Sequence, residues 1–175
     1  VYNVAIGSQA GYAISTGIRN TLIGGIAGDA LTDADYNTAV GMGALSSDTL
    51  GSRSTAIGQS TLNAQNFTTA TDTYNTAVGA FAGQSVTTGT LNTLVGGLAG
   101  DALTEGAANV AIGQNALSAD TLGARSIAIG RDALKTQNFS TTVTNTFNIA
   151  IGDKAGEAVT TGTKNVLIGG LAGDA

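Results

Sequence analysis

The chain has 175 residues, of which 26 are glycine, and it contains no proline, cysteine, tryptophan or histidine. Without cysteine or histidine it can form no disulfide framework, no thiolate or imidazole metal site and no histidine-based catalytic triad. A net charge of −5 with only seven basic residues argues against nucleic acid or an anionic membrane as a partner, and no apolar run approaches the roughly 20 residues of a transmembrane helix.

A short motif, Asn/Ser-x-Ala/Leu-Ile/Val-Gly, recurs ten times along the chain, and seven of the nine steps between successive motif glycines are 17 residues long. We call each step one unit, as from Gly7 to Gly24. The steps from Gly58 to Gly79 and from Gly130 to Gly152 are longer, at 21 and 22 residues. The motif glycines are Gly7, Gly24, Gly41, Gly58, Gly79, Gly96, Gly113, Gly130, Gly152 and Gly169. Four units form a super-repeat, with copies at 2–73 and 74–146 and a partial copy at 147–175. We therefore predict a single solenoid segment, 1–175, without a linker.

Each motif has the alternation of a short strand. In Asn37–Gly41, Thr38 and Val40 share one face and Ala39 has the other. A 17-residue unit is too short for two helices and a turn, and glycine recurs too often for long helices. At about 3.3 Å per residue, one such unit traces at most about 56 Å, which suits one flattened coil with two short strands and two turns. The sequence therefore predicts an all-β fold, a parallel β-solenoid of about ten stacked coils.

The apolar motif positions suggest how a coil is filled. Position four is Ile or Val in all ten units, which predicts a ladder inside the coil. Position three points the other way and is also apolar, with Ala in seven units and Leu22, Leu94 and Leu167 in the others. Because a strand with one solvated face would show polar residues there, we expect the position-three face to pack against copies of the chain. The sequence thus predicts a homo-oligomer with an alanine and leucine seam.

The motif copies NVAIG at 3–7 and 109–113, SIAIG at 126–130 and NTAVG at 37–41 and 75–79 resemble the repeats of YadA-like heads of trimeric autotransporter adhesins and related phage tail-fibre repeats. The resemblance covers the whole chain and implies a left-handed parallel β-roll, a homotrimer, an extracellular location on a cell surface or virion, and attachment to a host-surface glycan or protein. The units of this chain are longer than the usual head repeat, and every fourth unit is longer still.

The long fourth units are the candidate contact sites, because loops on a rigid scaffold commonly carry function. Each adds four or five residues and contains one phenylalanine. The candidate contact residues are Phe67, Thr69, Thr71, Phe139, Thr141 and Thr142. The competing interpretation of the two phenylalanines is that they fold back over the roll or pack between chains.

Other polar residues have structural interpretations. Asp29, Asp101 and Asp174 follow Gly-Gly-x-Ala-Gly and are expected to cap turns rather than to bind calcium, because the spacing differs from calcium-binding repeats. Asp48 and Arg53 flank a Thr-Leu-Gly turn and are expected to form an ion pair across the turn or between chains. We expect no metal, no cofactor and no catalytic residue.

The sequence leaves two main functions open, with a polysaccharide-processing tailspike as a distant third. The first is a structural or adhesive segment of a trimeric extracellular fibre that mediates attachment. The alternative is an ice-binding β-solenoid, since regular threonine arrays can order water. Threonine runs occur only once in four units, and motif position two varies between Thr and Val or Ile, so the sequence favours the fibre segment.

Overall fold

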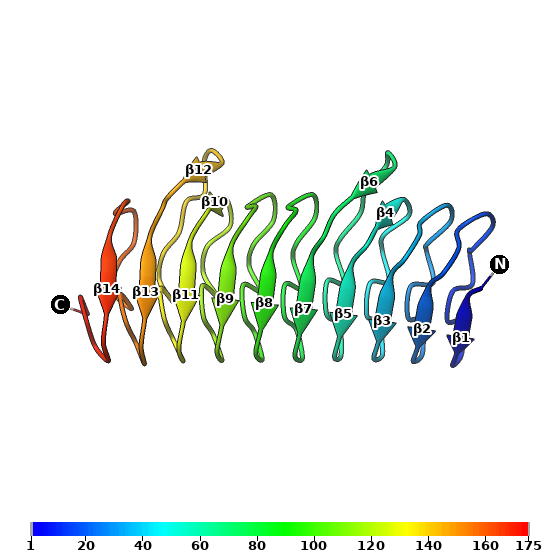
Figure 1. Ribbon diagram of the computed structural model, residues 1–175, viewed down its shortest axis with the longest axis horizontal. Coiled ribbons are helices and arrows are strands. Elements are labelled where there is room, and N and C mark those ends of the chain that lie inside the picture. Colours follow the sequence, from blue (N-terminus) through cyan, green and yellow to red (C-terminus); the bar gives the residue numbers. More distant parts are fainter. Residues whose placement is uncertain (1, 175) are drawn as a thin grey trace.

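The computed structural model describes residues 2–174, which form ten coils stacked along one axis (Figure 1). These residues contain no helix, and therefore none that could cross a membrane. One three-residue strand from each coil contributes to a parallel sheet in which every strand pairs with that of the next coil. Its strands are β1 (Val4–Ile6), β2 (Thr21–Ile23), β3 (Thr38–Val40), β5 (Thr55–Ile57), β7 (Thr76–Val78), β8 (Thr93–Val95), β9 (Val110–Ile112), β11 (Ile127–Ile129), β13 (Ile149–Ile151) and β14 (Val166–Ile168). The predicted parallel β-solenoid of about ten coils is confirmed.

The prediction of two strands in every coil is wrong for most coils. Among residues 2–174 a second strand pair forms only beside the two long units, where β4 (Gly51–Ser52) pairs with β6 (Thr71–Asp72) and β10 (Gly123–Ala124) pairs with β12 (Thr144–Asn145). Elsewhere this side of the stack is joined by isolated backbone hydrogen bonds, such as Thr87 N–H to the Thr104 carbonyl at 2.9 Å. The far side therefore stacks in register without regular strand geometry.

Residues with positive φ turn the chain in each coil. The residue before each motif and the second and fourth residues after each motif glycine have positive φ in all ten coils, as at Tyr36 (58°), Ser60 (51°) and Leu62 (48°). Most of these residues are not glycine, so their conformation could not be recognised from residue type. The motif glycine itself has a φ that other residues avoid, 138° at Gly41, and a methyl group there would overlap the Gly58 carbonyl of the next coil. This close approach explains why the motif ends in glycine.

The two faces of the main sheet are the reverse of those predicted. Position three points into the coil, where Leu22, Ala39 and Ala77 are completely buried. Position four points outward, and Ile57 and Ile112 are 39% and 37% exposed. The interior is too narrow for a β-branched side chain on every coil, because the opposite wall already contributes leucine and valine. The alanine and leucine column is therefore the core of a single chain and not a seam between chains.

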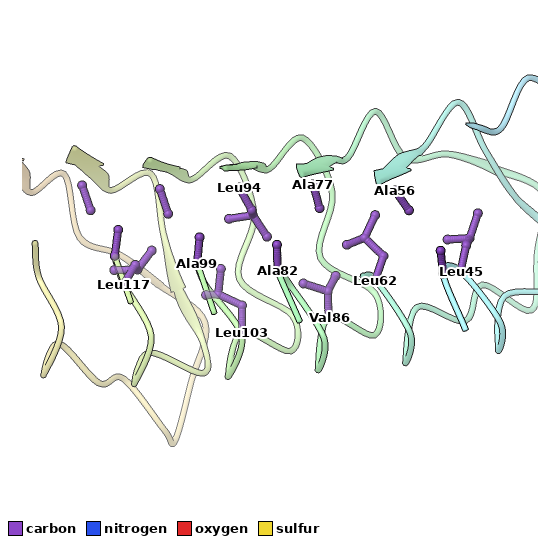
Figure 2. Close-up of a cluster of buried hydrophobic side chains, with 14 of the residues drawn as sticks. Leu45, Ala56, Leu62, Ala77, Ala82, Val86, Leu94, Ala99, Leu103 and Leu117 are labelled. Carbon is purple, nitrogen blue, oxygen red and sulfur yellow. The ribbon is translucent and has the colours of Figure 1, made fainter. Parts of the chain in front are cut away.

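The interior is filled by two coil types that alternate in pairs. Leu94 lies over Gly83 and Gly100, where a methyl group on either glycine would overlap its δ-carbons. In the third and fourth units the position of these glycines holds a buried leucine, such as Leu45 or Leu62. Motif position three, on the strand, holds alanine in these units. Figure 2 shows the resulting row of interlocking side chains. The period of four units thus follows from how large and small residues share one narrow core.

A ladder of buried asparagines at motif position one links the coils. The Asn92 N–H donates to Asn75 Oδ1 at 2.9 Å, and Asn92 Oδ1 accepts from the Asn109 N–H at 3.0 Å. Asn92 Nδ2 donates to the Gly106 carbonyl at 2.9 Å, so each amide joins two sides of the stack. Buried backbone groups at the corner are satisfied in this way. The ladder is interrupted at Ser54 and Ser126, where the long units begin.

Candidate functional site

The outer face of the main sheet is apolar at position four of the motif along the whole stack. Position four forms a column of isoleucine and valine in register, and position two adds a parallel column of threonine, valine and isoleucine. The position-four column consists of Ile6, Ile23, Val40, Ile57, Val78, Val95, Ile112, Ile129, Ile151 and Ile168. Parallel sheets are normally covered on both faces. We call these two columns the outer sheet face, and within residues 2–174 each of its side chains is partly or largely exposed.

One edge of the outer sheet face carries basic and aromatic residues. The residues that precede the ten motifs are Tyr2, Arg19, Tyr36, Arg53, Tyr74, Leu91, Ala108, Arg125, Phe147 and Lys164. The Arg53 guanidinium carbon lies 4.9 Å from the ring centre of Tyr36 and 5.8 Å from that of Tyr74. Arginines and rings therefore stack along the axis, so these ring faces are occupied within the chain.

The long units form loops that leave the stack on the same side. We call residues 67–73 and 139–146 the wide-coil loops; β6 and β12 lie in them and rise above the other coils in Figure 1. The loops are four coils apart, a distance of roughly 19 Å at about 4.8 Å per coil. Their repeated placement gives two equivalent projections on one rod.

The predicted contact residues divide into two groups. Thr69, Thr141 and Thr142 are exposed, and Thr71 is partly buried in β6. Phe67 is only 7% exposed and Phe139 is partly buried. The phenylalanines therefore fold back onto the coil, as the competing interpretation held, whereas three of the threonines are placed for contact. Whether the loops bind a partner stays a prediction.

The predicted ion pair between Asp48 and Arg53 is not formed. Asp48 is completely buried inside the coil, where Oδ1 accepts the N–H groups of Gly51 (3.1 Å) and Phe67 (3.0 Å). Arg53 lies outside and pairs instead with Asp72 of the loop, at 3.0 Å between Nε and Oδ1. The hydrogen bond and charge of Asp72 raise the pKa of Arg53 above its usual value. The short separation along the chain had suggested a turn-spanning pair, but the two side chains point to opposite sides of the coil wall.

A buried polar network continues from Asp48. Its Oδ2 accepts from Gln65 Nε2 at 2.6 Å, and the same nitrogen lies 2.9 Å from Ser54 Oγ. Gln65 Oε1 accepts from Asn75 Nδ2 at 2.9 Å, and Ser54 Oγ lies 2.6 Å from Thr73 Oγ1. The same contacts recur among Asp120, Ser126, Gln137, Thr146 and Asn148. The replacement of motif asparagine by serine just before each long unit is the sequence signal that could have revealed this network.

The aspartates of the Gly-Gly-x-Ala-Gly segments do not assemble a metal site. Within residues 2–174 no three acidic side chains come together as metal ligands would. The Oδ1 atoms of Asp29 and Asp101 are buried without a hydrogen-bond partner, and burial raises the pKa of Asp101. Asp35, which lies near the end of the same unit as Asp29, accepts the Ile18 N–H at 2.8 Å. The Oδ1 atoms of Asp29 and Asp101 therefore do not make the turn-capping hydrogen bonds that the sequence predicted.

Comparison of the chain with protein-family models, curated proteins and solved structures found no match. The part of the surface that the structure describes has no pocket. The features on which function can be argued are therefore the outer sheet face and the two wide-coil loops.

Proposed function

We propose that this chain is a structural and adhesive segment of a homotrimeric extracellular fibre, in which the outer sheet faces of three copies pack together. One observation carries the proposal: an unbroken column of ten isoleucine and valine side chains lies on the outside of a chain whose own core is already filled. A solvated sheet face normally carries polar residues, whereas position four carries none and position two carries threonine in only five of the ten coils.

The energetics favour burial of this face. Covering a valine or isoleucine side chain completely contributes about 1.5–3 kcal/mol, and these side chains, already partly covered by their neighbours, would each add a fraction of that. Ten coils repeat the contribution along each chain, and the β-branched columns present a regular surface to an identical surface. The choice of three copies rests on the resemblance to YadA-like heads.

In such an assembly the wide-coil loops would project away from the shared axis. They would present Thr69, Thr141 and Thr142 to a host-surface glycan or protein, while the stack supplies a stiff shaft. The segment would then both extend the fibre and display contact loops at a fixed interval.

Sedimentation equilibrium tests the assembly. The chain is expected to sediment at three times 17.1 kDa, and Val78→Glu on the outer sheet face to sediment as a monomer. Thr69→Glu, on a loop, is the matched control and should leave the mass unchanged. A monomeric parent chain, or a Val78→Glu variant that stays assembled, would contradict the proposal. Loss of binding on a glycan array by Thr69→Glu, with assembly intact, would test the adhesive role.

A second candidate function rests on the same face. Thr21, Thr38, Thr55, Thr76 and Thr93 pair in register over five consecutive coils, so half of the stack carries a regular threonine array of the kind that can order water. An exposed array would make the chain a monomeric ice-binding solenoid. Thermal hysteresis by the parent chain that is abolished in Thr55→Lys would support this function over the fibre segment.

A further inference from the structure

We propose that Asp48 and Asp120 are internal clamps that hold the wide-coil loops closed independently of the coil stack. Each loop would then open and close as a local unit, gated by one buried carboxylate. The clamps lie inside each chain and act in the same way however many chains assemble.

The carboxylate of Asp48 lies at the base of the first loop. It receives N–H groups from both sides of the segment: Gly51 lies at the start of β4, and Phe67 is the first residue of the loop. A methyl group at Gly51 would overlap the Asp48 carboxylate, so the chain approaches it as closely as only glycine allows. The carboxylate therefore fastens the base of the loop to the coil beneath it.

The coil is rebuilt to accommodate this buried group. The aspartate occupies a place that is aliphatic in the first and second units, at Ile14, Leu31, Val86, Leu103 and Val159. Leu45 restores the lost apolar volume from the position that is glycine in those units. Burying a carboxylate without a cation is costly, and here it is offset only by hydrogen-bond donors. The first and second units form coils with an aliphatic residue at this position, whereas the coil before each loop has a buried aspartate there.

The two loops differ in the partner of the arginine on their outer surface but share the same buried hydrogen bonds. Arg53 meets the acid Asp72, whereas Arg125 meets the neutral amide of Asn145 at 3.0 Å. The second strand pair nevertheless forms beside both loops. Both loops also share the buried network, in which the Asp120 carboxylate lies 2.6 Å from the side-chain nitrogen of Gln137 and 3.0 Å from the backbone nitrogen of Phe139. The inner carboxylate and not the outer ion pair is therefore the common anchor.

Hydrogen exchange tests the clamp directly. The amides of Thr71 and Thr73 donate to Leu50 and Ser52 only while the first loop is closed. Asp48→Asn places an amide nitrogen among donors, so these two amides should exchange roughly 10- to 100-fold faster. The Thr144 and Thr146 amides of the second loop, in the same molecule, are the internal control and should be unchanged, as should the Thr93 amide of the stack.

Exchanging the charge provides a rescue. In the double variant Asp48→Asn, Gln65→Glu the new amide can donate to the new carboxylate, and exchange at Thr71 and Thr73 should return to within about fivefold of the parent. A residue that only fills space would not be rescued by this exchange.

Arg53→Gln removes the outer ion pair without touching the core, and it should change loop exchange by less than about threefold. The inference is overturned if Arg53→Gln frees the loop as much as Asp48→Asn does. It is also overturned if Asp48→Asn leaves the loop protected or unprotects both loops together with the stack, or if the double variant gives no rescue. Should Asp48→Asn fail to fold, Arg53→Gln is compared with the parent chain, and a first loop that exchanges about 10-fold faster or more in this variant would overturn the inference.

Discussion

Removal of one rung of the asparagine ladder should be among the most damaging small changes to this chain. Asn92 lies near the middle of the stack, is completely buried and makes three hydrogen bonds through its side chain and N–H. Asn92→Ala deletes the acceptor for the Asn109 N–H and the donor for the Gly106 carbonyl. Both groups are backbone atoms of buried residues that water does not reach in the folded chain.

The expected cost follows from those two orphaned groups. Leaving a buried donor or acceptor unpaired costs about 1–3 kcal/mol, so the two together should lower the free energy of unfolding by about 2–6 kcal/mol. Asn66→Ala is the matched control, because its side chain is exposed and its Oδ1 only accepts a hydrogen bond from Thr49 Oγ1 at 3.3 Å. That substitution should cost less than about 1.5 kcal/mol.

Chemical denaturation followed by circular dichroism, at equal protein concentrations, measures both changes. The reasoning would be refuted by a loss below about 1 kcal/mol for Asn92→Ala, or by equal losses for the two variants.

Three further predictions concern packing, backbone and charge. In a chain made monomeric by Val78→Glu, Leu94→Ala should lower the free energy of unfolding by about 2–5 kcal/mol in denaturant titrations. In the same monomeric chain Val95→Ala, on the outer sheet face, should cost clearly less. Gly96→Ala should prevent close stacking and lower the melting temperature strongly, whereas Gly97→Ala should be tolerated, because Gly97 has no positive φ and an added methyl group would meet only the Ala80 carbonyl oxygen, at 3.9 Å. Burial raises the pKa of Asp101 in the folded state, so its contribution to stability is present below its unfolded pKa of about 3.9 and is lost as the pH rises. Asp101→Asn should therefore melt at a higher temperature than the parent near pH 7 but not near pH 3.

The repeat was sufficient to predict the architecture. The 17-residue spacing of most motif glycines left room for one coil per unit, and parallel in-register pairing then followed for strands such as β7 and β8. The long fourth units were correctly predicted to form loops. These features depend on chain length and local alternation, which a single sequence displays directly.

The direction of each side chain was not predictable in the same way. Positions three and four of the motif are both apolar, so alternation alone could not tell core from surface, and the larger residue was wrongly placed inside. The choice was decided by the narrow interior, which takes Ala77 from the strand and leaves Val78 outside. The buried role of Asp48 was missed because its partners Gln65 and Phe67 lie in the next coil, and contacts between coils depend on a register that the sequence does not show by itself.

Single cysteines give the most direct test of which face joins the chains, because the sequence has no cysteine of its own. Val78→Cys should form an intermolecular disulfide on mild oxidation, with two of every three chains linked, whereas the neighbouring Ala77→Cys should stay unreactive towards thiol reagents until the chain is unfolded. A reactive cysteine at position 77 in the folded chain, or one at position 78 that never links two copies, would contradict the account.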